Sequence, residues 1–492
     1  MTISLSAANL AALGKTVAVP RYRAGDLTPG IVHFGVGNFH RAHQATYLDA
    51  LFNEGSGHDW AIVGAGMRPE DKEMRADLER QDWLTTVVEQ EAASSKAHVI
   101  GSMIGYLRIG DVAGIVRELA EPQIRIVSLT VTEGGYFIDP ATGIFAADHP
   151  EIVADAAKPD EPRTVFGLIL AGLKARRGKG TAPFTVMSCD NLPHNGKVTR
   201  NAVVGLARLS DAALADWVEK AVAFPSGMVD RITPATGDRE RQIVDAEFAI
   251  ADRRPVFCED FVQWVLEDNF PTGRPALDKV GVTFVDDVSP WERMKIRILN
   301  GGHATIAYPA GLLDVHFVHE AMEHDLVRAY LEKVEREEII PVVPPVPDTD
   351  LNDYFAIIER RFANPKIGDT VRRLCFDGSN RQPKFILPTV HDRRAEGRPV
   401  TGLVLASAFW CRYCAGTTDS GAAIAPNDPA WDRLQPIARA AKANPEAWLA
   451  MGDIFGNLAK DESYFRRFAN ALTSIWRDGT QATLQAYLAG RV

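Results

Sequence analysis

The stretch from Trp291 to His303 gathers side chains that could carry out a proton transfer. On a helix of about 100° per residue, Asn300 and His303 lie roughly 140° and 80° around the axis from Lys295, so the three share roughly one face. A lysine packed against protein is pushed toward its neutral form, which a general base near neutral pH requires. Asn300 can donate to an oxygen that gains negative charge, and His303 can hold or orient the same oxygen. The stretch therefore predicts a catalytic helix.

The same stretch is also consistent with an ordinary amphipathic helix. In that interpretation Lys295 lies on the surface, His303 is buried, and Asn300 caps a helix end before Gly301 and Gly302. The stretch alone does not decide between the two interpretations, so the decision depends on the elements that would position it.

A short apolar strand at residues 31–34 runs into a turn of the form Gly35-x-Gly37, and a helical pattern follows at residues 42–52. Glycines in such a turn let the backbone approach a pyrophosphate, and the N–H groups at the start of the next helix attract it. The pattern predicts the first βαβ unit of a dinucleotide-binding domain. His40 stands where the third glycine of the usual motif would be, so a glycine turn in another α/β fold remains an alternative.

The cofactor preference depends on the turn that follows the next expected strand, at residues 60–64. An acidic side chain there, Glu70 or Asp71, can accept hydrogen bonds from the adenosine ribose and repel a 2′-phosphate, which favours NAD. Arg68 favours NADP, because a guanidinium can hold that phosphate. We expect NAD as the cofactor, with NADP as the alternative. These charged residues could also form a solvated turn that contacts no cofactor.

Polar side chains follow two further expected strands. Glu133 comes after the strand at residues 124–130, and Asn191 comes after the strand at residues 183–189. Doubly wound sheets bind ligands at the carboxyl ends of their strands. Glu133 is then placed to contact nicotinamide, substrate or a proton path, and Asn191 offers a second amide for an oxyanion. A solvated carboxylate and an Asx-type turn are the structural alternatives.

The chain changes character after its last expected strand, at residues 281–285. From Ser289 onward the patterns are helical. We therefore predict an α/β fold in which a Rossmann-type, doubly wound sheet domain at residues 1–286 precedes a mostly α-helical domain at residues 287–492. The Lys295 helix lies at their junction, and clefts between domains are favoured places for small-molecule sites.

Composition narrows the class of protein. The 492 residues carry a formal net charge of −10 and 46% hydrophobic residues, which argues against a nucleic-acid-binding surface. No apolar run approaches the roughly 20 residues that cross a bilayer, and the N-terminal residues lack a secretory pattern, so we expect a cytoplasmic protein. The pair Cys411-x-x-Cys414 lies in an apolar helical pattern, which is typical of core packing rather than of zinc or redox chemistry.

A metal site is considered at His316, His319, Glu320 and His324. The spacing from His319 to His324 is one residue longer than in H-E-x-x-H, so the two rings leave a common helix face. We expect no metal site.

Four stretches together resemble one family, the long-chain polyol dehydrogenases, or mannitol dehydrogenase family. They follow one another in the family's order across most of the chain, at residues 35–43, 130–136, 188–196 and 295–303. The resemblance implies a Rossmann-type domain, a mostly helical C-terminal domain, and metal-independent oxidation of a sugar alcohol by NAD or NADP.

The resemblance also implies catalytic roles. Lys295 would be the general base, and Asn191 and Asn300 would stabilise the alkoxide. His303 would position the substrate oxygen, and Glu292 matches a carboxylate associated with proton passage to solvent.

Binding roles follow from the same likeness. Asp230 and Arg373 match substrate-contacting positions, although by sequence alone Asp230 could instead pair with Arg231. Asp71 matches the acidic position that prefers NAD, and Asn38 stands where many relatives carry glycine. Cofactor contacts are expected at Gly35, Gly37, Asn38, Phe39, Arg41, Asp71 and Glu133.

The expected reaction is the reversible oxidation of D-mannitol to D-fructose. The alternatives within the family are reduction of fructuronate or tagaturonate and oxidation of D-arabinitol or D-sorbitol. A non-catalytic NAD-binding sensor and, more remotely, a metallohydrolase are the alternatives from other classes. The expected partner is a small polyol or ketose, and the oligomeric state stays open with a monomer favoured.

Overall fold

The structure is a computed structural model that describes residues 2–138 and 144–491. The chain forms two compact units, residues 1–289 and 290–492. The boundary expected from the sequence lies between residues 286 and 287.

The first unit is centred on a five-stranded sheet in the order β6-β3-β2-β7-β8. All neighbouring strands in it are parallel. The strands are β2 (Pro29–Phe34), β3 (Ala61–Ala65), β6 (Met103–Tyr106), β7 (Ile126–Leu129) and β8 (Thr185–Ser188). The order reverses between β2 and β7, which is the point where doubly wound sheets bind ligands outside the carboxyl ends of their strands.

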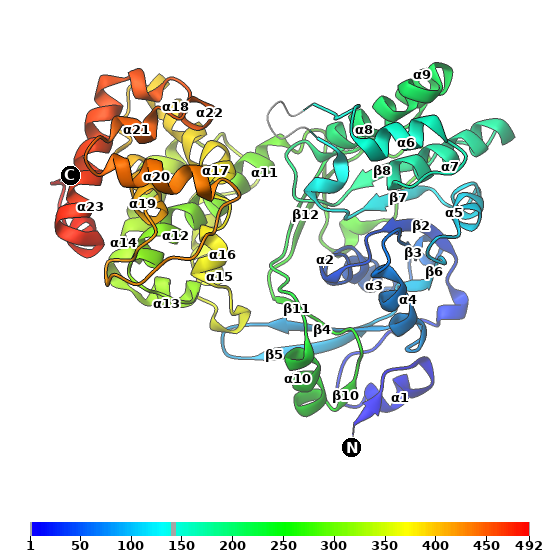
Figure 1. Cartoon of the computed structure of the whole chain (residues 1–492). Helices are drawn as coiled ribbons and strands as arrows, with labels where there is room; N and C mark the ends of the chain where they lie inside the picture. The colour runs from blue at the N-terminus through cyan, green and yellow to red at the C-terminus, as the bar shows by residue number, and fades with distance from the viewer. Residues whose placement is uncertain (1, 139–143, 492) are drawn as a thin grey trace. The chain divides into compact units, whose positions relative to one another are not determined.

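Successive residues of these strands enter two separate cores. Ile31 and Ile126 belong to one core, and Val32 and Val127 belong to the other. Helix α3 (Gln44–Asn53) contributes to the first core, and three helices contribute to the second (Figure 1). These are α5 (Val112–Leu119), α7 (Val165–Lys179) and α8 (Asn195–Ser210). Because both faces are covered, the strands are mostly apolar, as parallel strands usually are.

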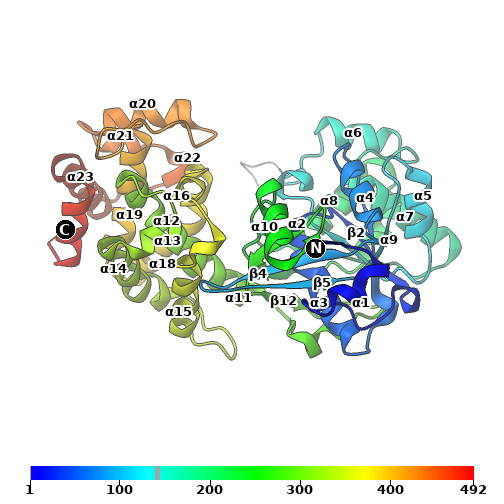
Figure 2. The same cartoon turned by 90° about the horizontal axis from the view of Figure 1, so that it is seen from below.

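Three smaller sheets complete the strands of the first unit, in the orders β11-β4-β5, β13-β12-β9 and β1-β10. Their bounds are β1 (Ile3–Ser4), β4 (Thr85–Gln90), β5 (Ser95–Ile100), β9 (Gly227–Asp230), β10 (Ile250–Ala251), β11 (Val256–Glu259), β12 (Gln263–Glu267) and β13 (Thr283–Val285). Strands β4 and β5 form an antiparallel pair that extends as an arm in both ribbon views (Figures 1 and 2). The remaining α-helices of the first unit are α1 (Leu10–Leu13), α2 (Asn38–Ala42), α4 (Asp71–Glu79), α6 (Pro150–Ala157), α9 (Ala212–Ala221) and α10 (Asp238–Phe248).

The second unit is built from helices. Its centre is α19 (Thr401–Cys414), which is buried from Gly402 to Cys414 and packs against α12 and α23. The others are α12 (Gly301–Leu312), α13 (Val318–Glu323), α14 (Asp325–Val334), α15 (Leu351–Phe362), α16 (Val371–Cys375), α17 (Gly378–Arg381), α18 (Leu387–Ala395), α20 (Trp431–Ala441), α21 (Glu446–Leu449), α22 (Gly452–Phe455) and α23 (Glu462–Leu488). A Rossmann-type domain therefore precedes a helical domain, and the predicted fold class is confirmed.

The pair Cys411 and Cys414 lies within α19, where both thiols are free and buried. Across residues 2–138 and 144–491, no helix combines the length and the apolar character that a membrane crossing requires.

Candidate functional site

The stretch around Lys295 is one continuous helix with an irregular middle. Helix α11 (Ser289–Met294) leads into the π-helical segment η6 (Lys295–Asn300), and α12 continues from Gly301. The backbone N–H of Gly301 donates to the carbonyl of Ile296, five residues earlier. The interpretation of Asn300 as the cap of a helix end is therefore wrong. Segments of π-helix occur frequently at functional sites.

The π segment changes the relation between Lys295 and Asn300. In a π-helix the backbone bonds span five residues instead of four, so each turn holds more residues and positions five apart lie closer around the axis than in an α-helix. The separation of roughly 140° was calculated for an ordinary α-helix and does not apply to this segment, because an apolar repeat does not reveal a local widening of the helix. Lys295 is buried, with 6% of its surface exposed, and Asn300 is partly exposed.

The ring of His303 lies further along this helix and is partly buried. It stacks on Phe362 with 4.0 Å between ring centroids and 12° between planes. Burial lowers the pKa of His303 well below its usual value, and the positive charges of Arg373 and Arg361 lower it further. The imidazole is therefore neutral, with one donor and one acceptor nitrogen. The structure thus brings His303 and Arg373, two predicted site residues, within electrostatic range.

The glycine pair after Asn300 allows two further π segments to pack against this helix. A Cβ on Gly302 would lie 3.0 Å from a carboxyl oxygen at the start of the segment Glu335–Ile339. A Cβ on Gly301 would lie 3.3 Å from a backbone carbonyl of the segment Gln382–Ile386. Small residues here let the helix that carries Lys295 be held closely on two sides.

Two other predicted site residues belong to the second unit: one lies on the helix just before the π segment, and the other lies on a neighbouring helix. Glu292, on α11, is buried with 6% of its surface exposed. Arg373, on α16, keeps about half of its side chain exposed and forms a two-pronged ion pair with Asp369.

In the first unit, the glycine turn follows β2 at the switch point of the sheet. Gly35 has φ +93°, and a Cβ there would lie 2.1 Å from the carbonyl oxygen of Thr130, which follows β7. Only glycine fits this approach. At Gly37, by contrast, a Cβ would meet nothing closer than 3.8 Å, so the backbone there is open.

Arg41 supports this turn from the protein side. Its buried guanidinium donates to the carbonyl of Gly37 over 3.2 Å, to the amide oxygen of Asn38 over 2.8 Å, and to the carbonyl of Arg254. The Asn38 amide in turn donates to the Thr236 hydroxyl over 3.1 Å. Arg41 and Asn38 lie at the expected cofactor turn, and these bonds fix the shape of the turn.

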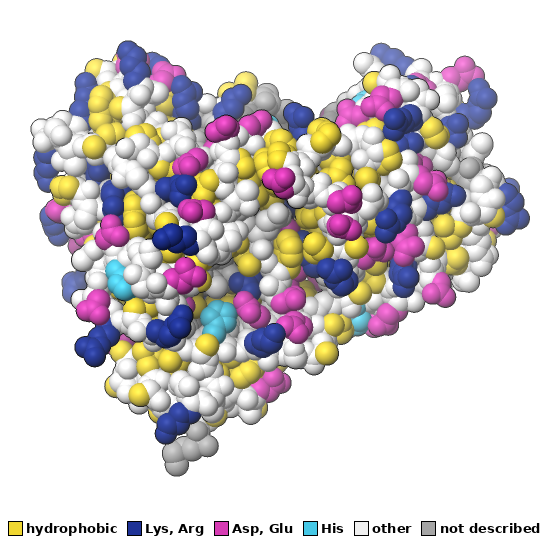
Figure 3. Space-filling view, turned by 180° about the vertical axis from the view of Figure 1, so that it is seen from behind, with side chains coloured by type: hydrophobic (Ala, Val, Ile, Leu, Met, Phe, Trp, Pro, Cys, Tyr) yellow, Lys and Arg dark blue, Asp and Glu magenta, His cyan; other side chains and the backbone are white. Residues whose placement is uncertain are grey.

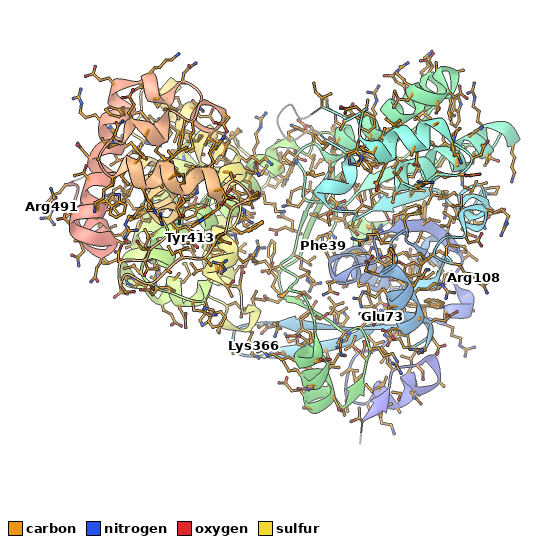
Figure 4. The ribbon with its side chains drawn as sticks, viewed as in Figure 1. Phe39, Glu73, Arg108, Lys366, Tyr413 and Arg491 are labelled. Atoms are coloured by element: carbon orange, nitrogen blue, oxygen red, sulfur yellow. The ribbon has the colours of Figure 1, made fainter. Side chains whose placement is uncertain are left out.

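Phe39 is the half-buried second residue of α2 and is labelled on that helix in Figure 4. Its ring stacks on His43 with 4.9 Å between centroids. The residue is therefore held at the start of the helix, next to the open backbone of Gly37.

His40, which replaces the third glycine of the motif, stacks on His33 of β2 with 3.4 Å between ring centroids and 11° between planes. His33 also makes a 2.8 Å bond between Nδ1 and the Ser128 hydroxyl, and a 2.9 Å bond between Nε2 and the Thr130 hydroxyl. Burial lowers the pKa of His33 to about 3 and that of His40 well below its usual value. Ring stacking thus replaces the close helix–strand packing that a third glycine provides.

Asp71 closes the turn after β3. Its Oδ2 accepts the backbone N–H groups of Met67 over 3.0 Å and Arg68 over 2.9 Å. The Arg68 side chain is 70% exposed and lies 4.0 Å from the Asp71 carboxylate. The acidic group is thus fixed in place while the basic one extends into solvent.

The loop after β8 is anchored by Asp190. Its carboxylate accepts the backbone N–H groups of Val131 over 2.9 Å and Thr132 over 3.0 Å, and the Tyr136 hydroxyl over 2.6 Å. Asn191 follows directly and is exposed. The expected site residue Glu133 begins η4 (Glu133–Tyr136), but its side chain lies outside the described residues.

Thr132 has φ 66° and ψ 165°. This conformation is essentially restricted to glycine and costs on the order of 1–3 kcal/mol for other residues. Such strain tends to gather at functional sites.

Asn195 joins the Asn191 loop to the strand that ends at Asp230. Its amide donates to the carbonyls of Asp190 over 3.0 Å and Gly227 over 2.8 Å, and its oxygen accepts the N–H of Gly227 over 2.9 Å. Two predicted site positions of this unit, Asn191 and Asp230, are therefore held on elements that are bonded to each other.

Arg231, next to Asp230, is buried and directs its guanidinium elsewhere. It donates to the Glu89 carboxylate over 2.6 Å, to the Ala42 carbonyl over 2.6 Å and to the Glu259 carbonyl over 3.0 Å. The ion pair of Arg231 is thus with Glu89, and the guanidinium fixes the end of β9 to three other elements.

The histidine cluster considered for a metal is organised differently. Glu320 caps the start of α13 by accepting the N–H groups of Phe317 over 2.8 Å and His316 over 3.2 Å. Among the residues that the structure describes, no three His, Cys, Asp or Glu side chains are grouped to hold an ion.

A family model described as the mannitol dehydrogenase Rossmann domain matches residues 29–279, and one described as the mannitol dehydrogenase C-terminal domain matches residues 287–476. The chain belongs to the mannitol dehydrogenase family. The resemblance inferred from the four sequence stretches is thereby confirmed.

Two mannitol 2-dehydrogenases illustrate the likeness in sequence. That of Cereibacter sphaeroides is 60% identical over 476 residues, which cover 96% of this chain and 99% of that protein. That of Pyricularia oryzae is 39% identical over 499 residues, which cover 99% of both.

Two solved structures illustrate the likeness in fold. The mannitol 2-dehydrogenase of Pseudomonas fluorescens, in a ternary complex with NAD and D-mannitol, is 43% identical with a TM-score of 0.87 over 99% of this chain and 100% of that one. A D-sorbitol dehydrogenase in substrate-free form is 33% identical with a TM-score of 0.91 over 98% of this chain and 100% of that one.

Some functional features of this family member were missed from the sequence. The polar run after β8 drew attention to Asn191, but nothing in the sequence showed that the neighbouring Asp190 anchors the loop. His33, a single polar residue within an apolar strand, was a signal for the stacked pair that was not used. On the face shown in Figure 3, acidic and basic side chains are interspersed.

Proposed function

We propose that this member of the mannitol dehydrogenase family oxidises a polyol with NAD, converting D-mannitol to D-fructose and catalysing the reverse reduction. The observation that carries this proposal is the 60% identity to a mannitol 2-dehydrogenase over 96% of the chain. A second support is the fold shared with an enzyme whose structure holds NAD and D-mannitol.

The first unit fits a dinucleotide. The open backbone at Gly37 leaves room for a pyrophosphate, and the adjacent turn is fixed by Gly35 and Arg41. Asn38, Phe39 and Glu133 complete the proposed contacts. Asp71 is fixed near the expected adenosine ribose, which favours NAD over NADP. When bound, NAD supplies the acceptor for the hydride that leaves the alcohol carbon.

Lys295 is the proposed general base. It is buried, which keeps its amine away from bulk water, and in the proposed step the neutral amine takes the proton of the reacting hydroxyl. Asn300 and Asn191 donate to the oxygen as negative charge builds on it. The C–H bond breaks with its electron pair, the O–H proton passes to Lys295, and a ketone forms. In reverse, protonated Lys295 returns the proton to the carbonyl oxygen.

The remaining residues position the substrate and move the proton. The neutral ring of His303 orients the reacting oxygen, and Asp230 and Arg373 bind other hydroxyls. Glu292, buried on the helical turn before Lys295, is the proposed group that passes the proton toward solvent.

The chemistry in this proposal needs no metal, because the lysine and the two amides supply the polarisation. We also propose a cytoplasmic location and a monomer. All five cysteines are free, which fits a reducing compartment. Size-exclusion chromatography with light scattering would test the oligomeric state.

The test of the activity is a spectrophotometric assay with D-mannitol, D-arabinitol and D-sorbitol, each with NAD and with NADP, after dialysis against a chelator. The proposal predicts rapid NADH formation from D-mannitol that the chelator does not reduce. No reaction with any polyol, together with NADH oxidation by fructuronate or tagaturonate, would replace the substrate. Loss of activity in chelator that zinc restores would contradict the metal-free mechanism.

A further inference from the structure

Asp190 holds a backbone segment that would not otherwise keep its shape. Its carboxylate accepts two successive backbone N–H groups, those of Val131 and Thr132, and the Tyr136 hydroxyl. Only 9% of Asp190 is exposed, so these bonds form away from bulk water. Charge-assisted bonds in such surroundings are strong and directional.

The segment that Asp190 holds is strained at Thr132. Its φ of 66° and ψ of 165° lie in a region that glycine alone adopts readily, and a β-branched residue there is an outlier. Such a conformation persists only where its surroundings impose it. The Asp190 carboxylate holds the N–H groups of Val131 and Thr132 before the strained torsions and the Tyr136 hydroxyl after them, so it spans the strained residue.

The same residue fixes the neighbouring loop. The N–H of Asp190 donates to the Ser188 hydroxyl over 3.2 Å, and its carbonyl accepts the Asn195 amide over 3.0 Å. Asn191 is the next residue in the chain. Asp190 therefore links the loop after β8 to the loop after β7, where Thr132 and Glu133 lie.

We propose that Asp190 is a positioning residue for the reaction: by holding Thr132 in its strained conformation, it sets the Thr132–Glu133 backbone and the Asn191 amide in register. This inference rests on the proposed function, in which Asn191 donates to the alkoxide and the loop after β7 contacts the cofactor. Its consequence is that the need for Asp190 depends on the residue at position 132.

The chain contains a matched control for this arrangement. Asp155, 2% exposed, also accepts two successive backbone N–H groups and a hydroxyl, those of Arg163 and Thr164. Thr164, however, has an ordinary extended backbone, with φ −105° and ψ 159°. A loss of activity or stability when Asp155 is replaced therefore measures the general effect of removing a buried carboxylate.

The experiment combines D190N with T132G or T132A and compares them with D155N. The amide of D190N presents an NH₂ to a backbone N–H that needs an acceptor, which releases the segment. Glycine at 132 adopts the required backbone freely, whereas alanine keeps the Cβ that causes the strain. Steady-state kinetics with D-mannitol and NAD, the dissociation constant for NADH by fluorescence, and the melting temperature are measured for each protein.

We expect D190N to lower kcat/KM by about a hundredfold and to weaken NADH binding. D190N/T132G should recover most of both losses, and D190N/T132A should not. D155N should lower the melting temperature and leave kcat/KM and NADH binding near those of the unaltered protein.

Two results would overturn the proposal. In the first, D190N/T132G folds but is no more active than D190N/T132A and binds NADH no more tightly. In the second, D155N loses as much kcat/KM as D190N does. If D190N does not fold, the single variants decide: T132G should melt no lower than T132A, and a clearly lower melting temperature of T132G contradicts the strain. If the unaltered protein oxidises no polyol, the proposed function fails, while the NADH dissociation constants of the same variants still test Asp190.

Discussion

Lys295 and Asn300 begin and end the same π-helical segment, so they lie closer together around the helix axis than the same spacing gives in an α-helix. A proton acceptor and a hydrogen-bond donor can then act on one oxygen. In an ordinary α-helix the spacing of five residues separates them by roughly 140° around the axis. The local widening of the helix therefore reduces the angle between the proposed base and the proposed donor.

Replacing Asn300 with alanine should lower kcat for polyol oxidation by about 10²- to 10³-fold, because a donor to the developing alkoxide is lost. The binding of NAD should change little, since Asn300 belongs to the second unit and the proposed dinucleotide site to the first. Steady-state kinetics with D-mannitol and NAD measure both effects. Asn470→Ala, at an exposed position on α23, serves as the control, and an equal loss of kcat in that variant would remove the assigned role from Asn300.

The two glycines of the turn should respond differently to alanine. Gly35→Ala puts a Cβ 2.1 Å from the Thr130 carbonyl oxygen at a positive φ, so we expect a lower melting temperature and weaker NAD binding. Gly37→Ala meets no protein atom closer than 3.8 Å, so the fold should persist while the new methyl group obstructs the pyrophosphate. Thermal melts and NADH titrations of both variants check this. A Gly37→Ala protein that binds NADH as tightly as the unaltered chain would place the pyrophosphate elsewhere.

The stacked pair His33 and His40 predicts a loss of stability in acid. Burial lowers the pKa of His33 to about 3 and that of His40 well below its usual value, whereas in the unfolded chain a histidine titrates near pH 6.5. Below about pH 6.5 the unfolded chain therefore binds more protons. The free energy of unfolding should fall by up to about 1.4 kcal/mol per pH unit for each ring as the pH drops below about 6.5.

The variant His40→Phe keeps a stacking ring that cannot be protonated. It should flatten the slope of unfolding free energy between pH 5 and about 6.5, while stability at pH 8 changes less. Denaturant unfolding across this pH range is the measurement, and His316→Gln, on an exposed histidine, should leave the slope unchanged. A slope that is the same in His40→Phe and in the unaltered protein would show that this ring is charged in the folded state.

The sequence predicted the elements with strong periodicity. Largely apolar runs such as residues 31–34 and 124–130 became the parallel strands β2 and β7, because strands buried on both faces are mostly apolar. The strands β4 and β5 were missed, because short segments with many polar residues carry a weak pattern.

The site was predicted less completely than the fold. Motif spacing identified Lys295, Asn300 and Asn191 as candidates, but it did not predict the π segment between the first two, because such a segment leaves no mark in apolar periodicity. The contacts of Asp190 and Arg231 join elements far apart in sequence, and a single sequence does not reveal which strand ends meet.

The most direct test of the central claim is the rate of D-mannitol oxidation by NAD in the variant Lys295→Ala, with NADH binding measured on the same protein. We predict a loss of several powers of ten in turnover, about 10³- to 10⁴-fold, with the NADH dissociation constant unchanged. Lys460→Ala, an exposed lysine of the same unit, should be as active as the unaltered chain. Normal turnover of Lys295→Ala would contradict the account, because the proton would then leave by another group.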